Sequence, residues 1–448
     1  MELRDLATAG LEAGAAIVIG TSSRSVNCRL ANNTVTTNGV EESVSVGVAA
    51  IEEDRVAAEV ADVQGREDVV ALADRANGRA RHVPPAPDAM PLLSPGDCPR
   101  ETAGGGEPRD LDLAPLLDGL RSALEQSRAH DLHLYAYAHL QDDTELLLSK
   151  TGVDLLGRRR AGSLSVTLKS PDLGRSVWAG RLAPGFEGIE PDAMFEHLIG
   201  RMAWSRRHLE LPPGDYEVIL EPSPAADMLV RLGWEMHARG ADEERTVFAG
   251  QGGSRVGELM YAPLINVESD PDHRQMRVPG FVRTLHSSEY SSVFDNGLAA
   301  PRTSWIKDGV QQELVCPRRW AEDHQHPVRA DPENLRLVGT ATTLEEMIAN
   351  TKRALLITSF WYIRDVDPSS LLLTGLTRDG VYLIENGEVV GSVNNFRFNE
   401  SPVRVLSRTT EIGEAELALS REAGDSVFVE APPIRVEGFH MSSVSDAI

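Results

Sequence analysis

The sequence is poor in cysteine and has no long apolar segment, and both features exclude whole classes of protein. The 448 residues include three cysteines, Cys28, Cys98 and Cys316, and no CxxC pair. We therefore expect neither a disulfide framework nor a cysteine-rich zinc site. The longest apolar stretches, at 15–20 and 354–358, fall far short of the ~18 residues that span a bilayer. The first residues carry acids and no basic segment followed by an apolar one, so we expect no secretory signal and a cytoplasmic location.

Positive charge is the second scarce feature. Lys and Arg total 44 against 68 Asp and Glu, so the net charge is −24. A chain this acidic repels phosphate backbones and anionic lipid headgroups. We therefore expect neither nucleic acid nor a membrane surface among its partners. The hydrophobic fraction of 41% is that of a folded globular protein.

The motifs of several common enzyme classes are also missing. The sequence has no GxxxxGK(S/T) phosphate loop, no GxSxG nucleophile elbow and no HExxH zinc motif. The glycine-rich run at 249–257 lacks the spacing and the strand–helix context of a phosphate loop, so we expect an ordinary flexible loop there.

Length and residue patterning predict an α+β protein with two domains, because 448 residues are too many for one ordinary core. Residues 1–211 contain several segments of small polar and β-branched residues, which predict an N-terminal α/β domain with a mostly antiparallel sheet. Asn38-Gly39 is expected to form a tight turn between two strands. Residues 83–108 are rich in Pro and Gly, which predicts a flexible loop. Helical periodicity marks residues 3–14, 69–80, 112–130 and 192–209.

Residues 212–448 predict a β-rich C-terminal domain. Strand-like segments dominate it, so we expect a mostly antiparallel and barrel-like arrangement. Corners at residues 378–380 and 385–387 are expected to close hairpins, because Asn and Gly tolerate positive φ.

Two further features of this domain are specific enough to test. Residues 342–354 predict a helix that has Thr342 or Thr343 as its N-cap and acidic residues in its first turn. The aromatic run at 360–362 is expected to serve packing rather than an interface.

One stretch, residues 224–242, decides how the chemistry of the chain is interpreted. Its spacing predicts a single amphipathic helix that ends at Gly240. The side expected to be buried consists of Met228, Leu229, Leu232 and Met236. Charges that alternate every four residues predict a surface ladder of ion pairs at Asp227, Arg231, Glu235 and Arg239. His237 follows near the C-terminal end, where an imidazolium would suit the helix dipole.

The histidines offer one HxH pair, His324 and His326. On a strand the two rings would share a face and could hold a metal ion. Their neighbours are typical of a solvated polar loop, so we do not expect a metal there. His286 lies among Ser and Glu residues and is expected to be a hydrogen-bonding loop residue.

The succession of segments resembles the TldD/PmbA family, also called modulator-of-gyrase-like proteins. Residues 11–35 and 42–57 are similar to the family's N-terminal sheet domain, and residues 278–305 and 341–406 are similar to its closing domain. The resemblance implies an N-terminal α/β domain, a β-rich C-terminal domain and a use in proteolysis or peptide processing. The family includes zinc metallopeptidases that work as TldD–TldE heterodimers.

For the TldD type, the resemblance implies an HExxxH helix at the position of residues 224–242. Its two histidines bind zinc, its glutamate is the general base, and a cysteine near the C-terminus completes the ligands. Such zinc keeps one position open for water and lowers the pKa of that water. The present helix departs from the pattern.

Two alignments of the motif with the helix are open. One sets Arg231-Leu232 at the His-Glu position and Met236 at the second His, and the other sets Leu232-Gly233 there and lets His237 match the second His. Neither supplies a Glu base or two ligands. No cysteine follows Cys316.

The resemblance therefore implies the TldE (PmbA) type, the subunit without the metal site. We expect a non-catalytic partner of a TldD-type zinc metallopeptidase that processes extended or unfolded peptides, with zinc in the partner and no cofactor on this chain. One alternative is a stand-alone peptidase or hydrolase with a recast site, built from His237 with Glu235, from His286, or from His324 and His326. The other is a homodimer that binds peptides without proteolysis.

Overall fold

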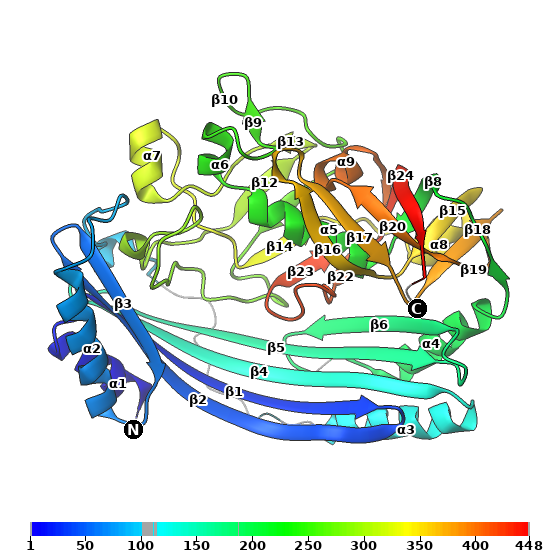
Figure 1. Ribbon diagram of the computed structural model, residues 1–448, viewed down its shortest axis with the longest axis horizontal. Helices are drawn as coiled ribbons and strands as arrows, with labels where there is room; N and C mark the ends of the chain where they lie inside the picture. Colours follow the sequence, from blue (N-terminus) through cyan, green and yellow to red (C-terminus); the bar gives the residue numbers. More distant parts are fainter. Residues whose placement is uncertain (1, 101–110, 112–113, 187, 447–448) are drawn as a thin grey trace.

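The structure of the protein, a computed structural model, describes residues 2–100, 111, 114–186 and 188–446. It confirms the α+β fold class. A long curved sheet from the N-terminal half lies along one side of the molecule, and the strands of the C-terminal half lie above it (Figure 1).

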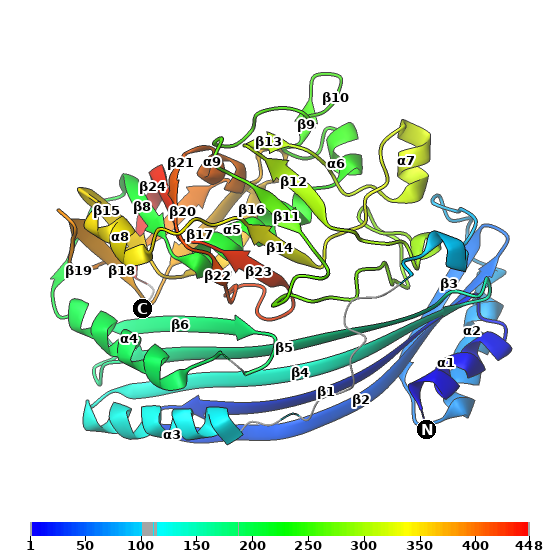
Figure 2. The ribbon, with the colours of Figure 1, turned by 180° about the vertical axis from the view of Figure 1, so that it is seen from behind.

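The N-terminal sheet has six strands in the order β3-β2-β1-β4-β5-β6, and all neighbours are antiparallel, as predicted. Its strands are β1 Ile17–Ala31, β2 Thr34–Glu52, β3 Arg55–Asp62, β4 His133–Ser149, β5 Asp154–Lys169 and β6 Ser176–Ala183. The four predicted helices are confirmed. They are α1 Leu3–Glu12 and α2 Arg66–Ala80 at one end of the sheet, and α3 Ala114–Ala129 and α4 Pro191–Trp204 at the other (Figure 2).

The first hairpin turns at Asn32 and Asn33 rather than at the predicted Asn38-Gly39. Both asparagines have positive φ, 48° and 61°, which a two-residue turn between twisted strands requires. Asn38 and Gly39 lie inside β2, where Asn38 is opposite Cys28. The prediction was wrong because two adjacent asparagines can adopt the same backbone as Asn-Gly, while the strand runs on through the glycine.

Strand β4 has two chemically different faces. Leu134 and Ala136 point into the apolar core shared with α3 and α4. Tyr135 and His139 lie on the opposite face, and His139 Nδ1 is 2.8 Å from Asp425 Oδ2 in the C-terminal half. The two-residue period of a strand thus makes one face core and the other a polar wall toward the C-terminal half.

The C-terminal half is built on two sheets. The larger has nine strands in the order β16-β17-β20-β24-β8-β15-β18-β19-β7, and a tenth, β21, pairs with β24. Its strands are β7 His208–Leu209, β8 Gly214–Leu220, β15 Arg353–Ile357, β16 Phe360–Asp367, β17 Leu372–Thr377, β18 Val381–Glu385, β19 Glu388–Val393, β20 Asn395–Glu400, β21 Thr409–Ile412 and β24 Ile434–Ser445.

The smaller sheet has six strands in the order β13-β12-β11-β14-β23-β22. Its strands are β11 Val267–Ser269, β12 Thr303–Lys307, β13 Val310–Gln311, β14 Asn334–Leu337, β22 Glu416–Leu417 and β23 Phe428–Ala431. Most pairs are antiparallel, but β7–β19, β8–β15 and β14–β23 are parallel. Within the described residues the strands form no closed barrel, so the barrel-like expectation was wrong; the helix α5 lies between the two sheets and keeps them apart.

Shorter elements complete the C-terminal half. The helices are α5 Pro222–Glu235, α6 Ala238–Asp242, α7 Arg318–His324, α8 Leu344–Ala349 and α9 Pro402–Ser407. The glycine-rich run forms a small hairpin of β9 Ala249–Gly250 and β10 Gly253–Ser254. Single 3₁₀ turns lie at Pro95–Asp97, Val293–Asp295 and Pro368–Ser370.

Of the two predicted corners, one closes a hairpin. Asn386 and Gly387, with φ of 52° and 85°, join the paired strands β18 and β19. The corner at 378–380 also has positive φ, at Asp379 and Gly380, but it joins β17 to β18, which are not neighbours in the sheet. A turn signal predicts a change of chain direction and does not say which strands pair.

Helix α8 confirms the predicted cap but is shorter than expected. The Thr343 hydroxyl accepts the Glu346 N–H, and the Glu346 carboxylate accepts the Thr343 N–H, which is a capping box. The helix ends at Ala349 because β15 starts at Arg353 and draws the chain into the large sheet.

The Pro- and Gly-rich segment is irregular, yet its first part is tied to the body of the protein. Asp88 accepts a hydrogen bond from Ser292 Oγ at 2.5 Å, and the Pro91 carbonyl accepts one from Arg318 at 2.8 Å. Residues 101–108 of the predicted loop lie outside the described residues. The domain boundary near Leu211 stays a prediction. Among the described helices, none is long and apolar enough to cross a membrane.

Candidate functional site

Helix α5 lies at the centre of the C-terminal half. It packs against β8 and β16 of the large sheet and against β14 and β23 of the small one. Met228, Leu229 and Leu232 are buried, as their spacing predicts. Gly233 allows the helix to approach β14, since a Cβ there would meet Leu335 Cδ1 at 2.8 Å.

The predicted single helix is broken into two. α6 begins after His237, whose backbone is extended at φ −128° and ψ 142°. The break follows from pairing with Val315, which donates to the Met236 carbonyl at 2.9 Å and accepts from the Ala238 N–H at 2.8 Å. Side-chain periodicity cannot show this, because the break is made by the backbone of a distant residue.

The charges of α5 do not form the predicted surface ladder. Asp227 is 1% exposed and accepts a hydrogen bond from Ser420 Oγ at 2.6 Å. Arg231 donates to the Ile363 carbonyl at 2.8 Å, and its Nη2 is 3.7 Å from a Glu422 oxygen. The prediction was wrong because i,i+4 spacing does not tell whether a row of side chains faces solvent or protein.

Asp227 is held in an unusual state for a carboxyl. Burial raises its pKa to about 7, although the hydrogen bonds from Ser420 and the Glu422 N–H oppose the shift. Its Oδ2 has no hydrogen-bond partner among the described residues. A buried carboxyl without a cation is more stable protonated, so Asp227 fastens the loop of Ser420 and Glu422 to α5.

The positions at which the two alignments place the zinc motif carry other chemistry. Arg231 is a cation that is bound to Ile363 and Glu422. Leu232 and Met236 lie in the apolar core at 0% and 1% exposure. None of these three side chains offers the anionic or imidazole donors that Zn²⁺ prefers.

His237 acts as the N-cap of α6. Its Nδ1 accepts the Gly240 N–H at 3.1 Å, so the ring proton sits on Nε2, which lies 3.3 Å from Glu289. The ring also meets Tyr290 edge-on at 4.8 Å. Burial lowers the pKa of His237, and Arg245 adds to the shift while Glu289 opposes it. Both nitrogens are therefore engaged within the protein.

Glu235 lies on the last turn of α5, half-buried. Burial raises its pKa, and the nearby carboxylates Asp365 and Glu289 raise it further. It has no ion pair or hydrogen bond through its side chain within the described part of the chain. The structure thus brings Glu235 and His237 together, and the His237 N–H donates to the Glu235 carbonyl at 2.9 Å. No hydrogen bond or ion pair joins their side chains within the described residues.

The other candidate histidines lie apart from α5. His286 is exposed, and its backbone hydrogen-bonds to Thr284. His324 ends α7 and stacks on Trp320 at 3.9 Å, while His326 Nε2 is 2.8 Å from Asp242 Oδ2. The HxH pair is therefore at a helix end and not on a strand. No three His, Cys, Asp or Glu side chains of the described residues form a group that could hold a metal ion.

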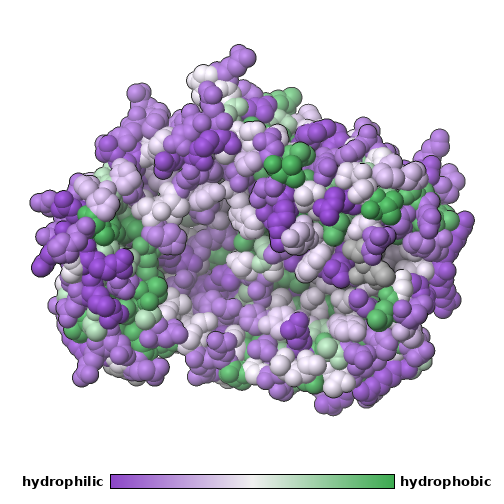
Figure 3. Space-filling view, viewed as in Figure 1, coloured by the Kyte–Doolittle hydropathy of each residue, from purple (hydrophilic) through white to green (hydrophobic). Residues whose placement is uncertain are grey.

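A cavity of about 390 Å³ lies between α5 and the N-terminal sheet. In Figure 3 this face of the molecule is hollowed between the two halves, and much of the hollow is hydrophilic. The lining combines α5, strands β4 and β5, and C-terminal loops. Its residues are Asp143, Glu145, Arg159, Val230, Gly233, Trp234, Arg283, Asp331, Pro332, Glu333, Leu335, Ser426 and Val427.

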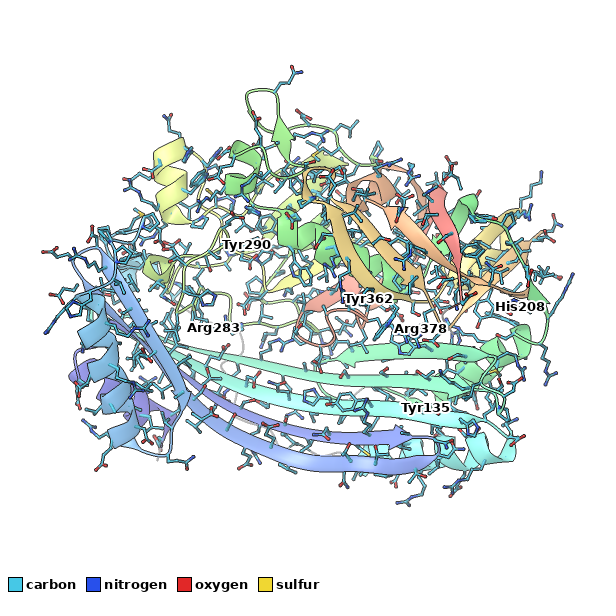
Figure 4. The ribbon with its side chains drawn as sticks, in the orientation of Figure 1. Tyr135, His208, Arg283, Tyr290, Tyr362 and Arg378 are labelled. Carbon is cyan, nitrogen blue, oxygen red and sulfur yellow. The ribbon has the colours of Figure 1, made fainter. Side chains whose placement is uncertain are left out.

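Arg283 connects the two halves across this cavity (Figure 4). Its guanidinium donates to Glu145 of β4 at 2.5 Å and to Glu333 at 2.6 Å. Burial alone would lower the pKa of Arg283, but the two carboxylates raise it above the usual value. Burial raises the pKa of Glu145, and Arg283 opposes that shift. The three side chains form one bridge between the halves.

Asp331 lines the same cavity without such a bridge. It is solvent-exposed at the cavity wall, yet the surrounding protein and the nearby Glu333 raise its pKa to about 7. A carboxylate at this position gains less solvation than one on an open surface. Asp331 has no hydrogen bond or ion pair through its side chain to any described residue.

Sequence reasoning missed the loop between β22 and β23, which contacts α5, β16 and the N-terminal sheet. Arg421 lies over Trp178 and Trp361 at 5.0 and 5.2 Å from the ring centres. Asp425 accepts from Ser163 Oγ at 2.9 Å on the N-terminal sheet. The loop has no periodicity that a sequence pattern could report, because its function as a connector depends on partners far away in the chain.

The aromatic run at 360–362 is only partly packed. Phe360 is fully buried, but Trp361 is 38% and Tyr362 53% exposed. Tyr362 has positive φ, 56°, and its N–H donates to Glu422 at 2.6 Å. Packing is therefore confirmed for Phe360, whereas Trp361 and Tyr362 are only partly covered and lie under the guanidinium groups of Arg421 and Arg364.

These features define a class of protein: a long curved antiparallel sheet facing a two-sheet C-terminal half, with one central helix at the cavity between them. Residues 213–443, more than half of the chain, match the PmbA/TldA metallopeptidase C-terminal domain. The chain belongs to this PmbA/TldD family.

Three solved structures share the fold over nearly their whole length. TldE from Thermococcus kodakarensis has a TM-score of 0.81 at 16% identity and covers 98% of this chain and 99% of its own. A protein described as a modulator of DNA gyrase from Bacteroides thetaiotaomicron has a TM-score of 0.77 at 14% identity, with 99% and 98% covered. One so described from Thermotoga maritima has 0.75 at 16%, with 98% of each. No curated protein matches the chain.

Proposed function

We propose that this chain is a non-catalytic, TldE/PmbA-like subunit that pairs with a TldD-type zinc metallopeptidase and helps it to process extended peptides. The observation that carries the proposal is the chemistry of α5 and its end. Arg231 is bound to β16, Leu232 and Met236 fill the core, and His237 caps α6. These residues do not fit a zinc site, so the metal belongs to the partner subunit and no step of peptide cleavage is assigned to this chain.

The similarity in fold to TldE supports the same assignment. The contribution of this chain is then to bind and orient the peptide beside the partner's active site. The cavity between α5 and the N-terminal sheet, about 390 Å³ with both charged and apolar walls, suits a short peptide segment rather than a folded protein.

An extended peptide can pair with an exposed strand edge through its backbone. On the edge strand β16, the Tyr362 N–H already donates to Glu422 and the Ile363 carbonyl already accepts from Arg231, so these two groups are taken. Strand β2 offers another edge, because β3 pairs with residues 45–52 and leaves the preceding part of β2 without a described neighbour on that side.

Co-expression with a TldD-type protein from the same genome tests the proposal. A tag on this chain should recover both proteins in equal amounts, and peptide cleavage should require the pair. Replacing the motif glutamate of the TldD-type subunit should abolish cleavage, whereas His237→Asn in this chain should preserve it, since Asn is a good N-cap. Cleavage by this chain alone, or its loss with His237→Asn, contradicts the proposal.

A further inference from the structure

The cavity beside α5 has more negative than positive side chains. Its lining contains four carboxylates, Asp143, Glu145, Asp331 and Glu333, and two guanidinium groups, Arg159 and Arg283. With all groups ionised, the carboxylates outnumber the cations by two. Charges enclosed by protein are screened less than surface charges, so this excess is felt within the cavity.

The two arginines are already engaged. Arg283 is shared between Glu145 and Glu333. Arg159 donates to the Asp425 backbone carbonyl and lies over the Phe428 ring at 4.7 Å. Neither guanidinium is available to Asp331, which is the lining carboxylate without a partner among the described residues.

Asp143 differs from Asp331 in having neutral donors. Ser23 Oγ donates to it at 2.6 Å, and Gln141 Nε2 donates at 2.9 Å. Hydrogen bonds from neutral groups stabilise a carboxylate but do not cancel its charge. The cavity thus has a hydrogen-bonded anion on the sheet side and an unpaired one on the C-terminal side.

An exposed aromatic side chain is the second, independent feature of this cavity. Trp234 of α5 lines it and is 44% exposed. The Arg231 guanidinium lies 4.9 Å from the Trp234 ring centre, which shows that the indole accepts a cation. Tyr290 lies nearby, where Glu235, Glu289 and Asp331 contribute to raising its pKa to about 12, with burial as the main cause.

We propose that this cavity binds one positively charged side chain, Lys or Arg, of an extended peptide. The ammonium or guanidinium group would pair with Asp331 and contact the exposed part of the Trp234 ring. The inference rests on the proposed function in taking a peptide as the ligand, and it adds a substrate class to it: peptides with a basic residue. No covalent step is involved.

The test uses the full-length chain and two pentapeptides of equal shape. Acetyl-Ala-Ala-Lys-Ala-Ala-amide and its norleucine analogue differ in the terminal ammonium group alone. Isothermal titration calorimetry should show that the lysine peptide binds about tenfold more tightly. Asp331→Asn should reduce that preference to about twofold or less, and Trp234→Leu should weaken the lysine peptide more than the norleucine one.

A matched control is Asp308→Asn. Asp308 lies in the β12–β13 turn away from the cavity, and its positive φ of 49° is compatible with Asn. This variant should keep the full preference. The proposal is overturned by equal affinity for the two peptides, by no binding of either, or by binding of calcium chloride in place of the lysine peptide.

The outcome is separable from that of the proposed function. The calorimetry is done without a partner subunit, so a lysine preference in the isolated chain stands even if no TldD-type partner co-purifies. Conversely, a complex that cleaves lysine and norleucine peptides equally leaves the subunit assignment intact and removes the proposed basic-residue site.

Discussion

At the scale of single residues, Asp227 shows how burial sets charge. Its pKa of about 7 lies well above the usual value of 3.8, so the folded chain keeps a proton that the unfolded chain releases between those two values. Folding stability contributed by this group therefore falls as pH rises from about 4 to about 7. At ~1.4 kcal/mol per pKa unit, the loss is ~4 kcal/mol at most.

Asp227→Asn should remove this pH dependence. The amide oxygen can still accept from Ser420 and the Glu422 N–H, while no proton is exchanged. Urea unfolding at pH 4.5 and pH 7.5 measures the difference, and the variant should lose less stability over this interval than the natural chain. Asp118→Asn on the exposed face of α3 is the control. An unchanged slope in Asp227→Asn would show that the carboxyl is not protonated in the fold.

Local sequence patterns predicted the burial or capping role of some residues and not of others. The buried Met228, Leu229 and Leu232 and the Thr343 cap follow from spacing within one helix. The burial of Asp227 could not be predicted, because its partner Ser420 is almost two hundred positions away in the sequence. Side chains whose environment is set by distant segments lie beyond any local pattern.

At the scale of elements, we expect Gly→Ala substitutions in two helices to change stability in opposite directions. A Cβ at Gly233 of α5 would meet Leu335 Cδ1 at 2.8 Å, whereas a Cβ at Gly200 of α4 would meet nothing within 4 Å. Gly233→Ala should therefore destabilise the fold by ~1–3 kcal/mol through overpacking. Gly200→Ala should stabilise it by up to ~1 kcal/mol through helix propensity. Thermal unfolding of both variants checks the signs, and a stabilised Gly233→Ala would mean that α5 is not packed on β14.

The elements themselves were largely predictable, and their connections less so. Helices α1 to α4 and the antiparallel N-terminal sheet follow from hydrophobic periodicity, which reports local conformation. The turn at Asn32-Asn33 was missed because several residue pairs can form such a turn. The break at His237 was missed because it is made by pairing with the backbone of Val315. The barrel-like expectation failed because strand content does not determine closure, and the strands here form separate sheets with α5 packed against both.

At the scale of the whole molecule, Arg283 is the clearest connection between the two halves across the cavity. It is 14% exposed and bridges Glu145 of β4 to Glu333. Arg283→Ala leaves two carboxylates facing each other without a cation, which should cost ~3 kcal/mol. Arg319→Ala, which removes an exposed pair on α7, should leave the unfolding midpoint unchanged.

A second substitution distinguishes the bridge from simple loss of packing. Glu145→Gln should destabilise the protein less in the Arg283→Ala background than in the natural chain. The reason is that the substitution relieves repulsion between Glu145 and Glu333, which exists only when Arg283 is absent. Chemical unfolding of the four chains in this cycle gives the coupling energy. Strictly additive effects would mean that Arg283 does not couple the halves.

The candidate site could be predicted only in part for the same physical reason. Helix α5 was recognisable from its sequence, but the cavity beside it needs β4 and the segment of Asp331 and Glu333 to meet across the fold. No spacing in the sequence reports that meeting. The resemblance to a family supplied the expected place of the site, and the structure supplied the side chains that surround it.

The most direct test of the central claim is the zinc content of the purified chain. Elemental analysis of the isolated protein, after dialysis against zinc-buffered solution, should find far less than one zinc per chain. The complex recovered with a TldD-type subunit should contain one zinc per pair and cleave unfolded peptides. One tightly bound zinc in each isolated chain would contradict the account, because Arg231, Leu232, Met236 and His237 could then not be filling the structural positions described here.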